Sequence, residues 1–154
     1  MTAQSFEKAV LACEKTLYRV SMAILQNGAD AEDAVSEAIL TAFRRRETLR
    51  EEKVFSTWLV RILINTCKKA LRARARRAET EIPPDAAAET PDEAQRLAVE
   101  EALAKLPEKI RLAVVLHYME GFPLEAAAKA LGVPVGTVKS RLARGRELLR
   151  LELE

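Results

Sequence analysis

Apolar residues recur at intervals of three to four positions along most of the chain, without the alternation that is typical of strands. This spacing is typical of amphipathic helices and predicts an all-α protein. The first predicted helix ends at Asn27-Gly28, the second begins near Asp30, and a long third helix covers residues 54–78. After a break, the same spacing predicts four shorter helices over residues 92–105, 107–119, 123–131 and 134–150.

Two features of the predicted N-terminal helices have a structural interpretation. Asp30, followed three residues later by Asp33, is typical of an N-cap with an approximate capping box. Phe55 and Trp58 share the helical spacing of Leu59. We therefore interpret both aromatic side chains as core residues and not as surfaces on which bases stack.

Residues 78–94 interrupt the helical pattern. This segment, AETEIPPDAAAETPDEA, holds three of the six prolines and six acidic residues, and it has little to bury. Such a composition cannot offset the entropy lost on ordering, so it predicts a flexible acidic linker. We therefore predict two small helical domains, residues 1–78 and 94–154, joined by a linker over residues 79–93.

A short break between two predicted helices marks the C-terminal domain. Gly132 suits a left-handed turn, and Pro134 suits the start of the next helix. Ala127 and Ala128 lie where two steeply crossing helices need small side chains. Apolar contacts between these helices are expected from Leu124, Leu131, Val133, Val138 and Leu142. Together these features predict a helix-turn-helix, whose second helix enters the major groove of DNA.

The second helix of this motif carries the candidate DNA-binding side chains. The residues that face away from the buried positions on a helical wheel are Lys139, Ser140, Ala143 and Arg144. Such side chains contact base edges in the major groove. Arg141 and Arg146 flank this face and are better placed for phosphates. The alternative is a surface helix with ordinary basic residues, but the glycine turn, the alanines and the charge all favour DNA binding.

Charge is unevenly distributed along the chain, although the formal net charge is only +2. Residues 44–77 carry 12 basic and 3 acidic side chains, and residues 105–150 carry 9 basic and 4 acidic ones. Between them, residues 78–104 carry 1 basic and 8 acidic side chains. Two basic segments separated by an acidic one indicate two contacts with a polyanion.

The sequence offers little for catalysis or metal binding. His117, the single histidine, lies in the apolar run LAVVLHYM and is interpreted as a core residue. No nucleophile triad, phosphate-binding glycine loop or metal-ligand spacing accompanies it. Cys13 and Cys67 are interpreted as free, packed thiols. Without a signal peptide or an apolar stretch of about 20 residues, we expect a cytoplasmic protein that is not an enzyme and needs no metal or cofactor.

The segment LPEKIRLAVVLHYMEGFPLEAAAKALGVPVGTVKSRLARGRELL resembles region 4 of the extracytoplasmic-function (ECF, group IV) sigma factors of bacterial RNA polymerase. The matching motifs are Leu106-Pro107, Gly121-Phe122 and the string GTVKSRL from Gly136 to Leu142. The resemblance implies that the second helix of the motif reads the upstream, −35, promoter element. The DNA-binding residues would be Lys139, Ser140, Arg141, Ala143, Arg144 and Arg146. Ala127 departs from the family, which more often has a larger aliphatic residue there.

The segment GADAEDAVSEAILTAFRR, from Gly28 to Arg45, resembles the sigma region 2 helix whose acidic start docks on the clamp helices of the largest polymerase subunit. The resemblance implies polymerase contacts for Asp30, Glu32, Asp33 and Glu37. The alternative role of acids in a first turn is to cap the helix and to complement its dipole, and for Asp30 we favour capping. Ser36 stands where the family often has Gln.

The segment FSTWLVRILINTCKKALRARARR, from Phe55 to Arg77, resembles the region 2 helix that holds and melts the downstream, −10, element. The resemblance implies that Asn65 approaches the non-template strand, while the basic residues contact phosphates. The DNA-binding residues here would be Asn65, Lys68, Lys69, Arg72 and Arg76. At Lys69 the family frequently has Asp. A loop that captures an extruded base is implied at about residues 47–56.

Together, the two regions imply a sigma factor that is controlled by an anti-sigma factor. It would bind core RNA polymerase, double-stranded −35 DNA and melted −10 DNA. Its linker would be a solvated spacer or a polyanion mimic near the RNA exit path. Two other classes stay open: a helix-turn-helix regulator that acts without polymerase, and a sigma mimic that only sequesters an anti-sigma factor. Promoter-specific transcription by core polymerase distinguishes the three.

Overall fold

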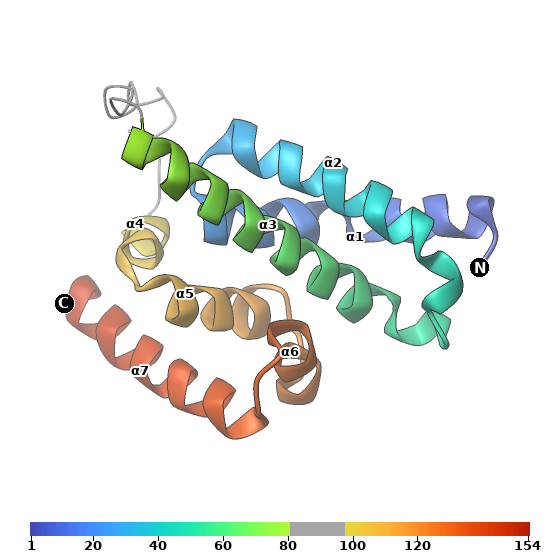
Figure 1. Cartoon of the computed structure of the whole chain (residues 1–154). Helices are drawn as coiled ribbons and strands as arrows, with labels where there is room; N and C mark the ends of the chain where they lie inside the picture. The colour runs from blue at the N-terminus through green and yellow to red at the C-terminus, as the bar shows by residue number, and fades with distance from the viewer. Residues whose placement is uncertain (81–97) are drawn as a thin grey trace.

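The computed structural model describes residues 1–80 and 98–154, and all regular secondary structure in these two ranges is helical (Figure 1). The predicted all-α fold is therefore confirmed. Most of the predicted linker lies outside the described residues, as does the start of the helix predicted over residues 92–105. Among the described helices, none has the length and apolar character needed to cross a membrane.

Two groups of helices make up the described chain (Figure 1). The N-terminal group contains α1 (Ala3–Leu25), α2 (Gly28–Arg44), the 3-10 turns η1 (Arg46–Thr48) and η2 (Glu52–Val54), and α3 (Phe55–Thr80). The C-terminal group contains α4 (Ala98–Lys105), α5 (Glu108–Val114), the π-helical turn η4 (Val115–Met119), α6 (Leu124–Leu131) and α7 (Val135–Leu153).

Helices α1, α2 and α3 form a three-helix bundle whose apolar faces meet in one core. Leu17 of α1 and Leu59 and Leu63 of α3 are completely buried. The buried side of α2 consists of small side chains at helical spacing, namely Ala31, Ala34, Ala38 and Ala42. Alanines at this spacing let α2 lie close to both neighbours. The prediction of core aromatics holds for Phe55, which is 5% exposed, while Trp58 is half-buried against it.

The start of α2 differs from the prediction. Asn27 is the N-cap, because its side-chain oxygen accepts a hydrogen bond from the backbone N–H of Asp30 at 2.9 Å. The prediction that Asp30 caps this helix is therefore wrong. Gln26, at the end of α1, has a left-handed φ of 52°, which reverses the chain so quickly that α2 already begins at Gly28. Asp30 thus lies inside the first turn of the helix.

The helix-turn-helix of α6 and α7 forms as the sequence predicts. Gly132 ends α6 with a left-handed φ of 69°, a conformation that favours glycine, and Pro134 precedes the first turn of α7. Ala127 is completely buried between the helices. Val138 and Leu142 of α7 are 0% and 3% exposed. The motif therefore rests on a packed interior that leaves the opposite face of α7 in solvent.

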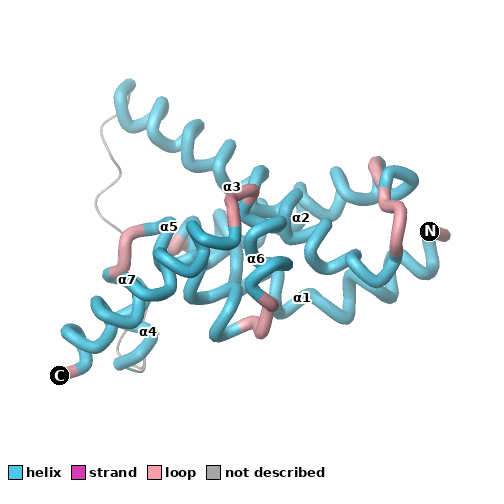
Figure 2. Tube along the Cα trace, turned by 90° about the horizontal axis from the view of Figure 1, so that it is seen from below, coloured by secondary structure: helices cyan, strands magenta, loops and turns pink. Residues whose placement is uncertain are grey.

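The two groups of helices pack against each other, which the sequence did not predict. Helix α6 lies against α3, and α5 with η4 lies against α1 (Figures 1 and 2). Their buried side chains form one continuous core cluster. Arg61 of α3 donates a hydrogen bond to the carbonyl of Ala130 at 3.4 Å and lies against Gly132, where a side chain would collide with the guanidinium. Helix α7 lies on the far side of α5 as seen from α3 (Figure 1).

Candidate nucleic-acid interface

The outward face of α7 presents the predicted DNA-binding residues to solvent. The exposed members are Lys139, Ser140, Ala143, Arg144 and Arg146, and Arg141 is half-buried. The Ser140 hydroxyl donates to the carbonyl of Gly136, one turn back in the helix, at 3.0 Å. A serine hydroxyl can also accept, so this bond leaves its oxygen available to a base donor. The structure thus brings all six residues onto one helix, with Arg141 at the edge of the face.

Two arginines of this face are already held by neighbouring side chains. Arg144 forms a salt bridge with Glu147, one turn further along α7, at 3.1 Å, and both side chains are about half exposed. Arg146 donates a hydrogen bond to the hydroxyl oxygen of Tyr118 at 2.7 Å. The first contact must break before Arg144 can bind a base, at a cost of less than about 1 kcal/mol for an exposed pair. The second contact leaves the positive charge of Arg146 unneutralised, because its partner is uncharged.

A second basic face runs along α3. The predicted residues Asn65, Lys68, Lys69, Arg72 and Arg76 are all exposed. Their spacing of three to four positions places them on one side of the helix, opposite the buried side chains of Leu63 and Cys67. The C-terminal part of α3 projects beyond the helical body (Figure 2). This face can therefore follow a nucleic-acid backbone without obstruction from the rest of the bundle.

One basic residue of α3 has a different role. Arg74 donates to the carboxylate of Asp30 at 2.5 Å and to the carbonyl of Leu25 at 3.3 and 3.4 Å. It thereby satisfies a carbonyl at the end of α1 and joins that end to the start of α2. In the sequence, Arg74 cannot be distinguished from the basic residues around it, since only the fold shows that its guanidinium contacts Asp30 and Leu25.

The acidic residues predicted to contact polymerase divide into two groups. Glu32, Asp33 and Glu37 are exposed on α2, and Asp33 and Glu37 are one turn apart. Asp30, in contrast, is held by Arg74. Glu32 also borders a groove between α1 and α2, which Leu11 and other apolar side chains line. Three of the four acids are therefore available to a partner, whereas Asp30 has a structural contact.

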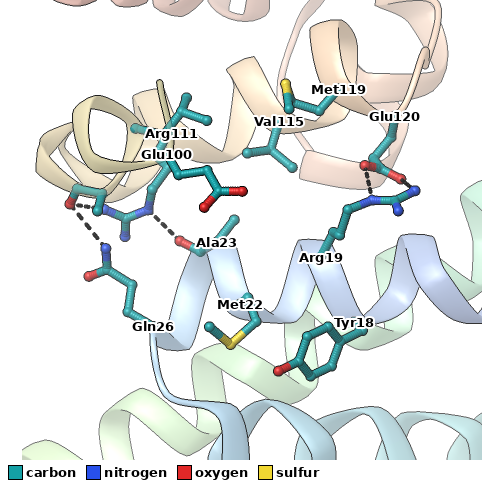
Figure 3. Close-up of a pocket in the computed structure, with 12 residues that line it drawn as sticks. Tyr18, Arg19, Met22, Ala23, Gln26, Glu100, Arg111, Val115, Met119 and Glu120 are labelled. Carbon is teal, nitrogen blue, oxygen red and sulfur yellow. Dashed lines mark hydrogen bonds and ion pairs between the residues drawn. The ribbon is translucent and has the colours of Figure 1, made fainter. Parts of the chain in front are cut away.

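Polar contacts join the two helix groups around a pocket of about 320 Å³ (Figure 3). The buried guanidinium of Arg111 donates to the carbonyl of Ala23 across the interface, and to the carbonyl of Leu106 at 2.8 Å. Burial lowers the pKa of Arg111. Gln26 donates to the carbonyl of Ala104 at 3.0 Å. The sequence signal for this role is a lone arginine inside the apolar run of α5, which sequence analysis missed.

An ion pair completes this interface (Figure 3). Arg19 of α1 makes two hydrogen bonds of 2.7 Å to the carboxylate of Glu120, which follows η4. These hydrogen bonds raise the pKa of Arg19. The two residues are 101 positions apart, so no local sequence pattern could have paired them.

The histidine and the two cysteines contact neighbouring groups inside the bundle. His117 is half-buried, and its ring Nδ1–H donates to the carbonyl of Phe122 at 2.7 Å. Burial raises the pKa of both the Cys13 and the Cys67 thiols, which disfavours the reactive thiolate. Across residues 1–80 and 98–154, no group of His, Cys, Asp and Glu side chains is arranged to hold a metal ion.

Comparison with known proteins accounts for both helix groups. The Sigma-70 region 2 family matches residues 9–77, and the Sigma-70 region 4 family matches residues 96–149. The RNA polymerase sigma-H factor of Pseudomonas aeruginosa is 31% identical over 173 residues, which cover 98% of this chain and 87% of that protein. The ECF RNA polymerase sigma factor SigM of Mycobacterium tuberculosis is 36% identical over 148 residues, covering 94% and 75%.

A solved structure of a sigma factor also resembles this chain. The sigma factor RpoE of Bartonella quintana, crystallised in complex with the anti-sigma factor NepR, superposes with a TM-score of 0.85. It shares 26% sequence identity, and the match covers 98% of each chain. Two exposed basic faces, an acidic helix and these relatives lead to one conclusion: the chain belongs to the ECF sigma factors of bacterial RNA polymerase, with sigma-70 regions 2 and 4, and is not an enzyme.

Proposed function

We propose that the chain directs RNA polymerase to promoters through three surfaces, one each on α7, α3 and α2. On α7, Lys139, Ser140, Ala143 and Arg144 read base edges of the −35 element, and Arg141 and Arg146 contact its phosphates. A long basic side chain suits guanine and an alanine methyl suits thymine, so this face can distinguish base pairs. The exposure of this face in a helix-turn-helix is the observation that carries the proposal.

The basic face of α3 binds the melted −10 element. Asn65 approaches the non-template strand, and Lys68, Lys69, Arg72 and Arg76 contact phosphates. Phosphate contacts provide affinity and a steep dependence on salt, but little sequence information. In this proposal, region 2 covers residues 1–78 and binds the −10 element, and region 4 covers residues 94–154 and binds the −35 element. The linker covers residues 79–93.

The acidic face of α2 docks on the polymerase through Glu32, Asp33 and Glu37. These three side chains are exposed. Within residues 1–80 and 98–154, they form no hydrogen bond or ion pair that would have to break before a partner binds. Asp30 belongs to the same first turn, but its pairing with Arg74 makes it a support of this face and a weaker candidate for direct contact.

Promoter binding requires the two domains to separate. Elements centred at −35 and −10 are about 25 base pairs apart, or roughly 85 Å at 3.4 Å per base pair. Helix α3, with 26 residues, is only about 39 Å long. Because α3 and α6 pack together here, the closed arrangement cannot place both basic faces on the two elements at once. The contacts of Arg19 and Arg111 therefore break on the promoter.

An anti-sigma factor is the partner proposed for the closed arrangement. The support is the likeness to the RpoE chain that was crystallised with NepR, which extends over 98% of both chains. A protein that binds both domains of the closed chain would prevent them from reaching the two promoter elements.

The test is to select DNA from a random duplex pool with this chain assembled on sigma-free core polymerase. The proposal predicts selected duplexes with two short elements at a fixed spacing. Arg144→Ala should remove the preference at one position of the upstream element only. If the chain without polymerase selected the same two elements with equal strength, it would instead be a regulator that acts on its own.

A further inference from the structure

The surface beside the recognition helix contains a tyrosine that none of the predicted roles uses. Tyr118 is 50% exposed and lies in η4, between α5 and α6. Its hydroxyl oxygen accepts the 2.7 Å hydrogen bond from Nη1 of Arg146. Arg146 is also exposed, so its positive charge stays accessible to a partner in solvent.

The backbone around Tyr118 is unusual. Val115–Met119 form a π-helical turn, closed by the N–H of Glu120 on the carbonyl of Val115 at 2.9 Å. Such turns are rare and often accompany a functional site. One extra residue in a turn rotates the side chains that follow by about 100° around the helix axis. The turn thus decides which side chain of η4 faces α7.

A second feature brings Arg146 to Tyr118. At the neighbouring position, Gly145, a Cβ atom would lie 2.6 Å from Cγ2 of Val114 and 3.2 Å from Cγ2 of Ile110. Helices α5 and α7 therefore approach so closely that only glycine fits between them without a shift. This contact sets the position of residue 146 on α7 relative to the end of α5.

The ring of Tyr118 is itself supported. It meets the ring of His117 edge-on, with ring centroids 5.0 Å apart, and His117 is anchored by its hydrogen bond to the carbonyl of Phe122. A chain of contacts thus leads from a backbone carbonyl through two rings to the guanidinium of Arg146. Preorganisation of this kind reduces the side-chain entropy that a long arginine loses when it binds a phosphate.

We propose that Tyr118 is a positioning residue, which holds Arg146 in the orientation needed to bind a DNA phosphate beside the recognition helix. This inference rests on the proposed binding of DNA by α7. Tyr118 acts through Arg146: without the arginine, its hydroxyl contributes nothing to DNA affinity. Three independent features carry the inference, namely the hydrogen bond, the π-helical turn and the glycine crossing.

The experiment is a double-mutant cycle with the full chain assembled on core polymerase and a duplex obtained from the selection described above. Dissociation constants are measured between 50 and 300 mM KCl for the wild type, Tyr118→Phe, Arg146→Ala and the double variant. Arg146→Ala should reduce the slope of log affinity against log salt by about 0.9, as expected for one lost phosphate contact. Tyr118→Phe keeps the ring and should weaken binding about fivefold.

The double variant distinguishes positioning from other roles. It should bind as Arg146→Ala does, with no further loss, because the two residues act as one unit. Tyr18→Phe removes the hydroxyl of the other tyrosine, on α1, and serves as the matched control without effect. Additive losses, an unaltered Tyr118→Phe or an unaltered salt slope for Arg146→Ala would overturn the inference. None of these outcomes depends on the base preference that Arg144 provides. The measurement of that preference tests the proposed function separately.

Discussion

The side chain of Glu120 is 1% exposed, and its carboxylate accepts two hydrogen bonds of 2.7 Å from the guanidinium of Arg19, whose side chain is 51% exposed. This ion pair joins the segment between η4 and α6 of region 4 to α1 of region 2. It is asymmetric, because one charge is buried while the other reaches solvent. The two partners therefore contribute differently to the closed arrangement of the domains.

Removing Arg19 should open the chain more than removing Glu120. Arg19→Ala leaves a carboxylate without its donors at the interface, which costs about 1–3 kcal/mol in the closed state. Glu120→Ala leaves an arginine that water can solvate, at a cost below about 1 kcal/mol. The radius of gyration from small-angle X-ray scattering should increase for Arg19→Ala and change little for Glu120→Ala. Equal expansion of both variants would contradict this asymmetry.

Replacing each of two glycines of α7 with alanine should change the stability of the chain in opposite directions. Gly145→Ala places a Cβ atom against Val114 and should destabilise region 4 by about 1–3 kcal/mol. Gly136 has nothing within 4 Å of the added atom, so Gly136→Ala should stabilise the helix by about 0.5–1 kcal/mol. Thermal unfolding by circular dichroism compares the two variants. A Gly145→Ala variant as stable as the wild type would show that α5 and α7 pack less tightly than described.

Arg144→Ala should relax sequence preference in the upstream element. A bidentate contact of arginine with a guanine provides about 1–3 kcal/mol of discrimination at its base pair. Competition between duplexes that differ at single positions measures this preference for the reconstituted holoenzyme. The matched control is Glu147→Ala, which frees Arg144 from its salt bridge and should leave the preference in place. A uniform loss of affinity for all duplexes would assign Arg144 to phosphates instead.

Asp33→Arg should weaken association with core polymerase without unfolding the chain, since Asp33 is exposed on α2. The expected loss reflects charge reversal at the proposed docking face, where like charges repel. Glu101→Arg makes the same charge change at an exposed site on α4 and is the control. Binding to immobilised core polymerase measures the effect. Equal binding by both variants would remove α2 from the docking surface.

The buried thiol of Cys67 makes stability depend on pH. Burial raises its pKa above the ordinary value of 9.0, so the folded chain keeps a proton that the unfolded chain loses. Its contribution is therefore complete below about pH 9 and decreases as pH rises above that value. The difference in unfolding free energy between the wild type and Cys67→Ala should change over this range. A pH-independent difference between pH 7 and 10.5 would show that the thiol is not shielded from solvent.

Local patterns predicted the helix-turn-helix well. The left-handed Gly132, the buried Ala127 and the inward Val138 each follow from a steric need at a known spacing. Such steric requirements are local, so the residue types in the sequence indicate them. The predicted cap of α2, Asp30, lies three residues after the observed cap, Asn27. Both residue types are good caps, and only the left-handed conformation of Gln26 decides between them.

The closed arrangement of the two domains could not be predicted. It depends on Arg111 and on the pair of Arg19 with Glu120, whose members are far apart in the sequence and belong to different helices. Helical periodicity shows that a face is buried, but it does not show which helix covers it. The role of Tyr118 was hidden for the same reason, because the π-helical turn and the crossing at Gly145 are visible only in three dimensions.

Transcription by purified components tests the central claim most directly. The full chain is added to sigma-free core polymerase with fragmented genomic DNA as template, and the 5′ ends of the transcripts are mapped. We predict initiation at a limited set of sites that share two upstream elements at one fixed spacing. Transcripts no more specific than those of core polymerase alone, from a chain that still binds the polymerase, would contradict the account.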